Sequence, residues 1–156
     1  SYFAKYAPDI VAFGKALREK LRERLPGVSE VVYMYENQET LLISYSPTGK
    51  GYDAPLTMSL LPREVRLYFG QGPLLSKSDP NKLLQGSGKS VRYVVLSSIA
   101  DFDRADIQAL IAAGLKLAKL RLDPAAKGSM IIKGEAQKKR AAARKASKRP
   151  TAKARR

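Results

Sequence analysis

Residues 79–117 read DPNKLLQGSGKSVRYVVLSSIADFDRADIQALIAAGLKL, and they carry the clearest structural signals in the chain. Asp79 followed by Pro80 predicts the start of a short helix, because aspartate is a good N-cap and proline is favoured at the first helical position. Gly86 predicts the end of that helix, since glycine readily adopts the left-handed conformation found there. Residues 90–97 alternate and are rich in Val, Tyr and Leu, which favours a half-buried strand.

A second, amphipathic helix is predicted directly after this strand. Asp103 is the expected N-cap, and the apolar residues that follow it recur at helical spacing. These residues are Ile107, Leu110, Ile111, Gly114 and Leu117 with Ala118. A last strand and a last helix therefore form the frame on which the rest of the chain must pack.

The sequence GSGKS at residues 86–90 resembles part of a phosphate-binding loop. The complete motif, GxxxxGK[ST], requires glycine at position 83, where this chain has Leu83. Such a loop also follows a strand and precedes a helix, whereas the predicted order here is the reverse. We therefore predict a glycine-rich turn at this place rather than a nucleotide site.

The preceding part of the chain predicts an opening helix and further strands. Residues 8–25 place apolar side chains at helical spacing, and Pro26 with Gly27 ends that pattern. Strands are predicted at 28–36, 40–46, 56–61 and 64–70, mostly joined as hairpins. With the strand at 90–97, they predict an α+β fold in which an antiparallel sheet of about five strands has both long helices on one face.

Composition limits the chemistry that the chain can perform. The absence of cysteine excludes disulfides and thiolate sites, and the absence of histidine removes the usual general base and a common metal ligand. We expect no cofactor and no catalytic residue, because no pair of carboxylates stands out as acid and base; an enzyme of unknown reaction is an alternative. No apolar run approaches the roughly 18 residues of a membrane span, and no secretion signal opens the chain, so we expect a cytoplasmic protein without a membrane partner.

The net charge of +15 is concentrated at the C-terminal end. Residues 136–156 contain no acidic residue and ten basic residues: Lys138, Lys139, Arg140, Arg144, Lys145, Lys148, Arg149, Lys153, Arg155 and Arg156. The other 19 basic residues of the chain are nearly balanced by its 14 acidic residues. Because this low-complexity segment has almost no large apolar side chains, we predict a disordered basic tail at 123–156 after a folded domain at 1–122.

The basic tail predicts non-specific binding of DNA or RNA. Lysine and arginine side chains release counterions when they contact phosphates, so affinity is expected to fall with salt and to depend little on base sequence. A solubilising appendage is the alternative interpretation of the same charges. A nucleic-acid role would add association with the nucleoid to the expected cytoplasmic location.

The predicted sheet offers a second candidate surface. Tyr33 and Tyr35 lie two residues apart and therefore point to the same side, as do Arg66 and Tyr68, and Arg92 adds another cation on a strand. On a face away from the helices these side chains would suit stacking on bases or on another planar ligand. Ordinary half-buried tyrosines are the alternative interpretation. The sequence names no particular ligand or protein partner for the domain.

Two stretches of the chain resemble the YdhG-like domain, a family of small bacterial proteins mostly without assigned function. They are LREKLRERLPGVSEVVYM at 17–34 and LLQGSGKSVRYVVLSSIADFDRADIQALIAA at 83–113, within a resemblance that covers 8–122. The resemblance implies a helix–sheet–helix fold similar to that of frataxin, and an iron-binding chaperone as the alternative function. In such a site carboxylates of the first helix would hold the iron, and here Glu19 and Glu23 alternate with basic residues that would repel a cation.

Overall fold

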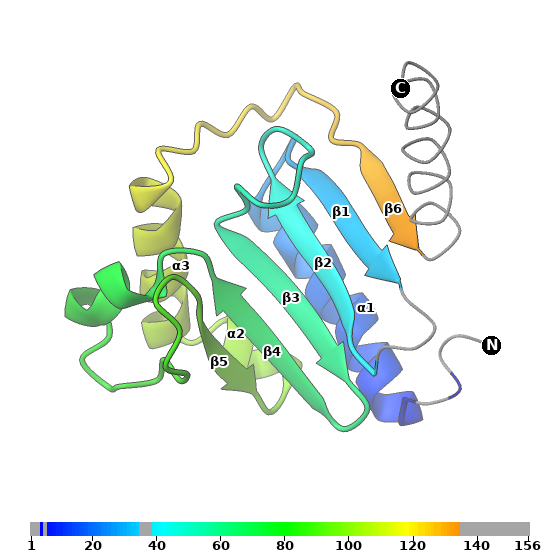
Figure 1. Cartoon of the computed structure of the whole chain (residues 1–156), viewed down its shortest axis with the longest axis horizontal. Helices are drawn as coiled ribbons and strands as arrows, with labels where there is room; N and C mark the ends of the chain where they lie inside the picture. Colours follow the sequence, from blue (N-terminus) through cyan, green and yellow to red (C-terminus); the bar gives the residue numbers. More distant parts are fainter. Residues whose placement is uncertain (1–3, 5, 35–38, 135–156) are drawn as a thin grey trace, which may run out of the picture.

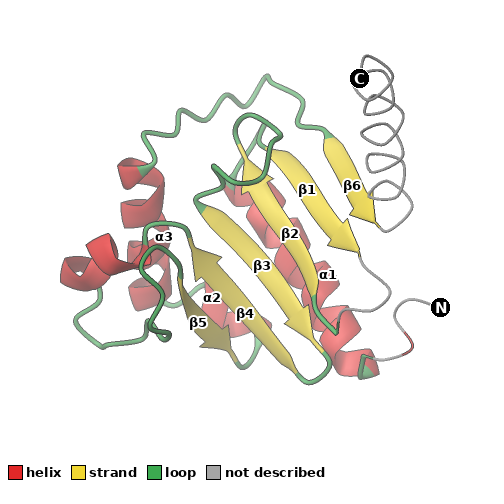
Figure 2. Ribbon diagram, in the orientation of Figure 1, coloured by secondary structure: helices red, strands yellow, loops and turns green. Residues whose placement is uncertain are grey.

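The computed structural model describes residues 4, 6–34 and 39–134, which form an α+β fold with one mixed sheet (Figure 1, Figure 2). The elements in chain order are α1 (Pro8–Arg24), β1 (Ser29–Met34), β2 (Leu41–Ser46), β3 (Leu56–Leu61), β4 (Glu64–Phe69), the 3-10 helix η2 (Gly72–Ser78), β5 (Arg92–Leu96), α2 (Ile99–Phe102), α3 (Ala105–Leu117) and β6 (Met130–Gly134). The strands lie side by side in the order β5-β4-β3-β2-β1-β6.

The sixth strand corrects the expectation of a purely antiparallel, five-stranded sheet. Strands β1 to β5 pair antiparallel with one another, whereas β6 pairs with β1 in parallel, from Met130 opposite Glu30 to Gly134 opposite Met34. Because β6 belongs to the sheet, the folded part of the chain reaches at least to Gly134. The expected boundary after Leu122, with a disordered tail from residue 123, is therefore wrong.

Backbone pairing, rather than burial, holds β6 in place. The Glu30 amide donates a hydrogen bond to the Ser129 carbonyl at 2.8 Å, directly before β6 begins. Met130 and Ile132 remain 56% and 43% exposed, so the strand contributes little to the core. A five-residue strand with exposed apolar side chains leaves no strong hydrophobic pattern, which explains why the sequence did not predict it.

The core lies between the sheet and the two long helices. Figure 1 shows α1 behind the strands and α3 at the β5 side of the sheet. Leu17 and Leu21 of α1 and Leu110 and Ile111 of α3 are fully buried in it. Helix α1 lies close to β3 because Gly14 has no side chain: a Cβ atom there would come within 2.5 Å of the Leu60 side chain. Both helices pack on the same face of the sheet, and no long helix covers its other face in the described residues.

The short helix expected between Asp79 and Gly86 does not form. Helix η2 ends before it, and the Asp79 carboxylate accepts hydrogen bonds from the backbone amides of Leu83 at 2.8 Å and Leu84 at 2.9 Å. Lys82 has a φ of 53°, a left-handed conformation that a right-handed helix does not contain. Asp79 thus binds amide groups as a capping residue would, but it organises a loop.

The closing helix is divided into α2 and α3, which changes the role of Asp103. Ser98 and Asp101 form a capping box at the start of α2, and α3 follows with Arg104 as its N-cap residue. Asp103 is therefore not the N-cap of the long helix. Its carboxylate instead pairs with Lys20 of α1 at 2.6 Å, so it links the closing part of the chain to the opening helix.

We expect a chain that ends at Leu122 to be less stable than a chain that ends at Gly134. The shorter chain loses the backbone hydrogen bonds of β6, each worth about 1 kcal/mol net, while it avoids the entropy of ordering that strand. A difference of about 1–3 kcal/mol in the free energy of unfolding is expected from these opposing terms. Urea unfolding followed by circular dichroism measures it, and equal stabilities would contradict a structural role for β6.

Candidate functional site

The face of the sheet opposite α1 and α3 carries the candidate site, and we call it the open face. Figure 1 looks onto this face, with the strands in front of α1. The register places these residue pairs side by side on it: Tyr33 with Leu42, Ser44 with Thr57, Ser59 with Arg66, and Tyr68 with Tyr93. Most of these side chains are polar or aromatic, whereas the opposite face forms the apolar core.

Arg66, Tyr68 and Tyr93 form a compact group that we call the Arg66 cluster. The two tyrosine rings lie with their centroids 5.2 Å apart and their planes at 42°. The Arg66 guanidinium carbon is 4.3 Å from the centre of the Tyr93 ring, within the range of a cation–π interaction. The Arg66 Nη1 atom also donates a hydrogen bond to the Tyr68 hydroxyl at 3.2 Å, so all three side chains hold one another.

Arg66 carries a fixed positive charge at this place. Its Nε atom donates to the Glu64 carboxylate at 2.5 Å, and its side chain is 26% exposed. The hydrogen bond to Tyr68, followed by that to Glu64, raises the pKa of Arg66 above its already high ordinary value. The cluster therefore presents two aromatic rings beside a permanent cation.

The other tyrosines of the predicted sheet surface do not join this cluster. Tyr33 lies on the open face, but it stands on β1, where the Lys133 ammonium group is 5.5 Å from the centre of its ring. Tyr35 lies outside the described residues. The structure thus brings Arg66 and Tyr68 together, as their spacing predicted, and places Tyr33 at a separate position near β6.

Arg92 does not lie on the open face, which corrects the sequence prediction. It stands opposite Phe69, whose side chain is fully buried in the core, so it points to the helix side of the sheet. Its Nε atom donates to the Gly88 carbonyl at 3.0 Å. The next residue, Tyr93, occupies the open face instead, and only knowledge of the pairing between β4 and β5 would have identified it.

A hollow of about 750 Å³ lies on the open face over β2, β3 and β4. Leu42, Arg66 and Tyr68 line it together with several hydroxyl-bearing side chains. The Ser44 and Thr57 hydroxyls are hydrogen-bonded to each other at 2.8 Å. The lining residue Ser59 is fully buried, and its hydroxyl has no hydrogen-bond partner among the described residues.

The loop between β2 and β3 packs onto one end of the open face. Gly51, with a φ of 95°, lies so close to the Tyr33 hydroxyl that any side chain at this position would clash with it. The Asp53 carboxylate holds the loop by accepting hydrogen bonds from Ser46 at 2.6 Å and Thr48 at 2.5 Å. Burial acts to raise the pKa of Asp53, but these hydrogen bonds outweigh it and keep that pKa below its ordinary value.

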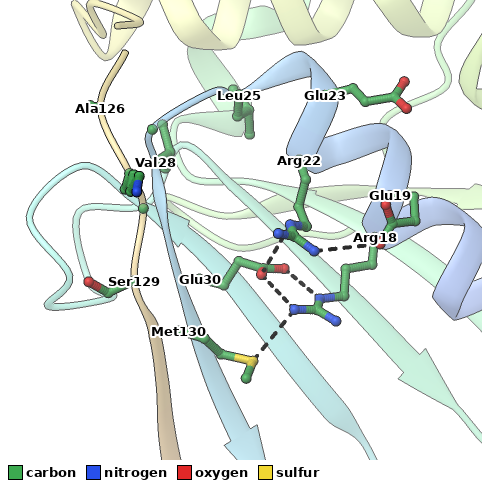
Figure 3. Close-up of a pocket in the computed structure, with 13 residues that line it drawn as sticks. Arg18, Glu19, Arg22, Glu23, Leu25, Val28, Glu30, Ala126, Ser129 and Met130 are labelled. Carbon is green, nitrogen blue, oxygen red and sulfur yellow. Dashed lines mark hydrogen bonds and ion pairs between the residues drawn. The ribbon is translucent and has the colours of Figure 1, made fainter. Parts of the chain in front are cut away.

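A second cavity, of about 650 Å³, lies between the end of α1 and residues 126–130 (Figure 3). Glu30 is its most buried charged group, with a side chain only 7% exposed. Arg18 donates two hydrogen bonds to the Glu30 carboxylate, at 2.8 and 2.9 Å, and Arg22 lies 3.8 Å from it. The arginines that line this cavity are therefore already engaged with an internal carboxylate, which indicates a structural ion cluster.

The same ion cluster perturbs its neighbours. The hydrogen bond to Glu30 is the main reason that the pKa of Arg18 is raised. Tyr45 donates a hydrogen bond from its hydroxyl to Glu30 at 3.1 Å. Burial above all, and then the Glu30 charge, raise the pKa of Tyr45 far above its ordinary value of 10.0, so this phenol stays protonated in the folded chain.

Replacement of Glu30 by alanine is expected to destabilise the fold by about 2–3 kcal/mol, because Arg18 and Tyr45 both lose their partner. Arg18 is partly exposed, which keeps the cost below that of a fully buried pair. Glu19→Ala is the matched control: its side chain is 66% exposed and its carboxylate pairs with Arg22 at 3.6 Å, so a change below about 0.5 kcal/mol is expected. Equal urea midpoints for the two variants would contradict the structural role of Glu30.

The raised pKa of Tyr45 predicts a loss of stability at alkaline pH. Above about pH 10 the unfolded chain releases this proton and the folded chain retains it, so the free energy of unfolding falls as the pH rises. Tyr45→Phe removes the titrating group and should show a shallower fall between pH 9 and 11, measured by urea unfolding. Tyr52→Phe, at a side chain 83% exposed, is the control and should follow the wild type. Identical pH profiles for wild type and Tyr45→Phe would contradict this assignment.

The described residues offer no metal site. In 4, 6–34 and 39–134, no group of three or more Asp, Glu, His or Cys side chains is arranged to hold a metal ion. This part of the chain therefore provides no set of ligands for the iron that the alternative function would require. Likewise, none of the helices described has the length and apolar character needed to cross a membrane.

The predicted nucleic-acid-binding residues of the tail, from Lys138 to Arg156, lie outside the described residues. Comparisons with protein-family models, with curated proteins and with solved structures found no match to this chain. The resemblance to YdhG-like domains therefore stays a prediction.

Proposed function

We propose that this chain is a non-enzymatic nucleic-acid-binding protein whose residues 136–156 bind DNA or RNA without sequence preference. The observation that carries the proposal is the charge of this segment, which has ten basic residues and no acidic residue. Polyanionic phosphate backbones are the chemical partner that such a segment fits best. The proposed location is the cytoplasm, in association with the nucleoid.

The position of β6 supports a joint role for the tail and the sheet. Lys133 lies on the open face beside Tyr33, and Gly134 is the last described residue of the strand. The basic residues of 136–156 follow β6 in the sequence, after Glu135.

The proposal includes a classification of the folded domain. The order of helix, sheet and helix, with α1 and α3 on one face, supports a YdhG-like domain with a frataxin-like arrangement. In this proposal the domain contributes a ligand or partner surface rather than catalysis.

The proposal is tested by comparing the full chain with a chain that ends at Gly134, so that β6 stays intact. Binding of a labelled DNA duplex is measured by fluorescence anisotropy at several salt concentrations. The full chain should bind with an affinity that falls steeply with salt. Each lost phosphate contact should make the negative slope of log K against log salt shallower by about 0.9. The shorter chain should bind the duplex at least about tenfold more weakly at low salt.

A full-length variant with all ten basic residues of 136–156 replaced by glutamine is the matched control for chain length. It should behave like the shorter chain, because the charges rather than the length are proposed to bind. Equal duplex affinity for the wild type and this neutral variant would overturn the proposed function.

A further inference from the structure

The Arg66 cluster has the properties of a stacking platform. Aromatic rings and guanidinium planes are the two protein surfaces on which unstacked bases are commonly bound. Here Tyr68 and Tyr93 stand side by side, and Arg66 lies against the Tyr93 ring. Since Arg66 is also tied to Glu64 and to the Tyr68 hydroxyl, the platform is ordered before any ligand arrives.

The hollow next to the cluster adds groups that suit the edge of a base. The hydroxyls of Ser44 and Thr57 are hydrogen-bonded to each other. The Ser59 hydroxyl, in contrast, is buried without a hydrogen-bond partner among the described residues. Buried polar groups without a partner are rare in folded proteins and call for an explanation. Ser59 stands opposite Arg66 in the pairing of β3 with β4, so its buried hydroxyl lies below the surface of the sheet next to the platform.

The size and polarity of the hollow fit a flat ligand of nucleoside size. Its volume of about 750 Å³ falls within the range of about 300–1,000 Å³ that is typical of small-molecule sites. Its lining combines the apolar residues Leu42, Leu61 and Val91 with several hydroxyl-bearing residues. A nucleobase has the complementary character, with apolar ring faces and a polar edge.

The charges of the open face separate base binding from phosphate binding. The positive charge of Arg66 is balanced by the paired carboxylate of Glu64, and Glu39 also lines the hollow. This region is therefore not a strong phosphate site. In the proposed function the phosphates are bound by the basic residues of 136–156. The sheet from β6 to β5 spans five strand spacings, or about 24 Å, which is room for several nucleotides.

We infer that the open face binds the bases of a single-stranded nucleic acid, with Tyr68 and Tyr93 stacking on them. The inference rests on the proposed function, and it adds a preference to it. In a duplex the bases are stacked inside and cannot reach the platform, whereas in a single strand they can turn toward it. The chain should therefore prefer single strands, and this preference should reside in the Arg66 cluster.

The experiment compares two labelled probes with the full chain: a 12-nucleotide oligothymidylate and a 12-base-pair DNA duplex. The double variant Tyr68→Leu/Tyr93→Leu should lose about tenfold or more in affinity for the oligothymidylate and less than about twofold for the duplex. Tyr68→Phe/Tyr93→Phe keeps both rings and should retain most of the single-strand affinity. Tyr52→Leu removes an exposed tyrosine of the loop between β2 and β3, which is not part of the Arg66 cluster, and should change neither affinity.

Arg66→Gln provides a second route if the double leucine variant does not fold. It removes the guanidinium plane from a partly exposed position and should also reduce single-strand affinity without affecting the duplex. Unchanged oligothymidylate affinity in the folded variants, or an equal loss on both probes, would overturn the inference. Neither outcome would contradict the proposed function. That function is contradicted only if replacement of the ten basic residues of 136–156 leaves duplex binding unchanged.

Discussion

Alternation of side chains along each strand is the constraint on which this molecule depends. In β4 it sends Val65, Leu67 and Phe69 into the core, and it sends Arg66 and Tyr68 to the open face. A shift of one residue in strand pairing would exchange these two sets, so burial against α1 and α3 strongly fixes the register. The same apolar contacts that stabilise the fold therefore also position the polar cluster on the opposite side.

Features with a local cause were predictable from the sequence. Helix α1 requires only apolar residues at helical spacing, such as Leu17 and Leu21, and its expected span differs from the observed one by a single residue. Strands β2, β3 and β4 have equally local alternation and turn signals. Arg66 and Tyr68 were placed on one side because residues two apart share a face in any strand.

Features that depend on a distant partner were not predictable in this way. β6 is a strand because β1 offers it an edge, and its exposed Met130 and Ile132 give no core pattern. Tyr93 rather than Arg92 faces the cluster because of the register between β4 and β5. The carboxylate assigned to a helix cap, Asp103, pairs instead with Lys20 on another helix. Each error concerns a contact between segments that are far apart in the sequence. The spacing of residues within one segment does not predict such contacts.

The parallel pairing of β6 with β1 determines when the edge of the sheet at β1 is closed during folding. The Ser129 amide donates a hydrogen bond to Ser29 across 100 positions, so this edge closes only after almost all of the described chain has been made. Contacts of such long sequence separation form slowly. Until then the outer edge of β1 is an open template for strands of other molecules. The interval before this closure is therefore the period in which a newly made chain is most exposed to aggregation.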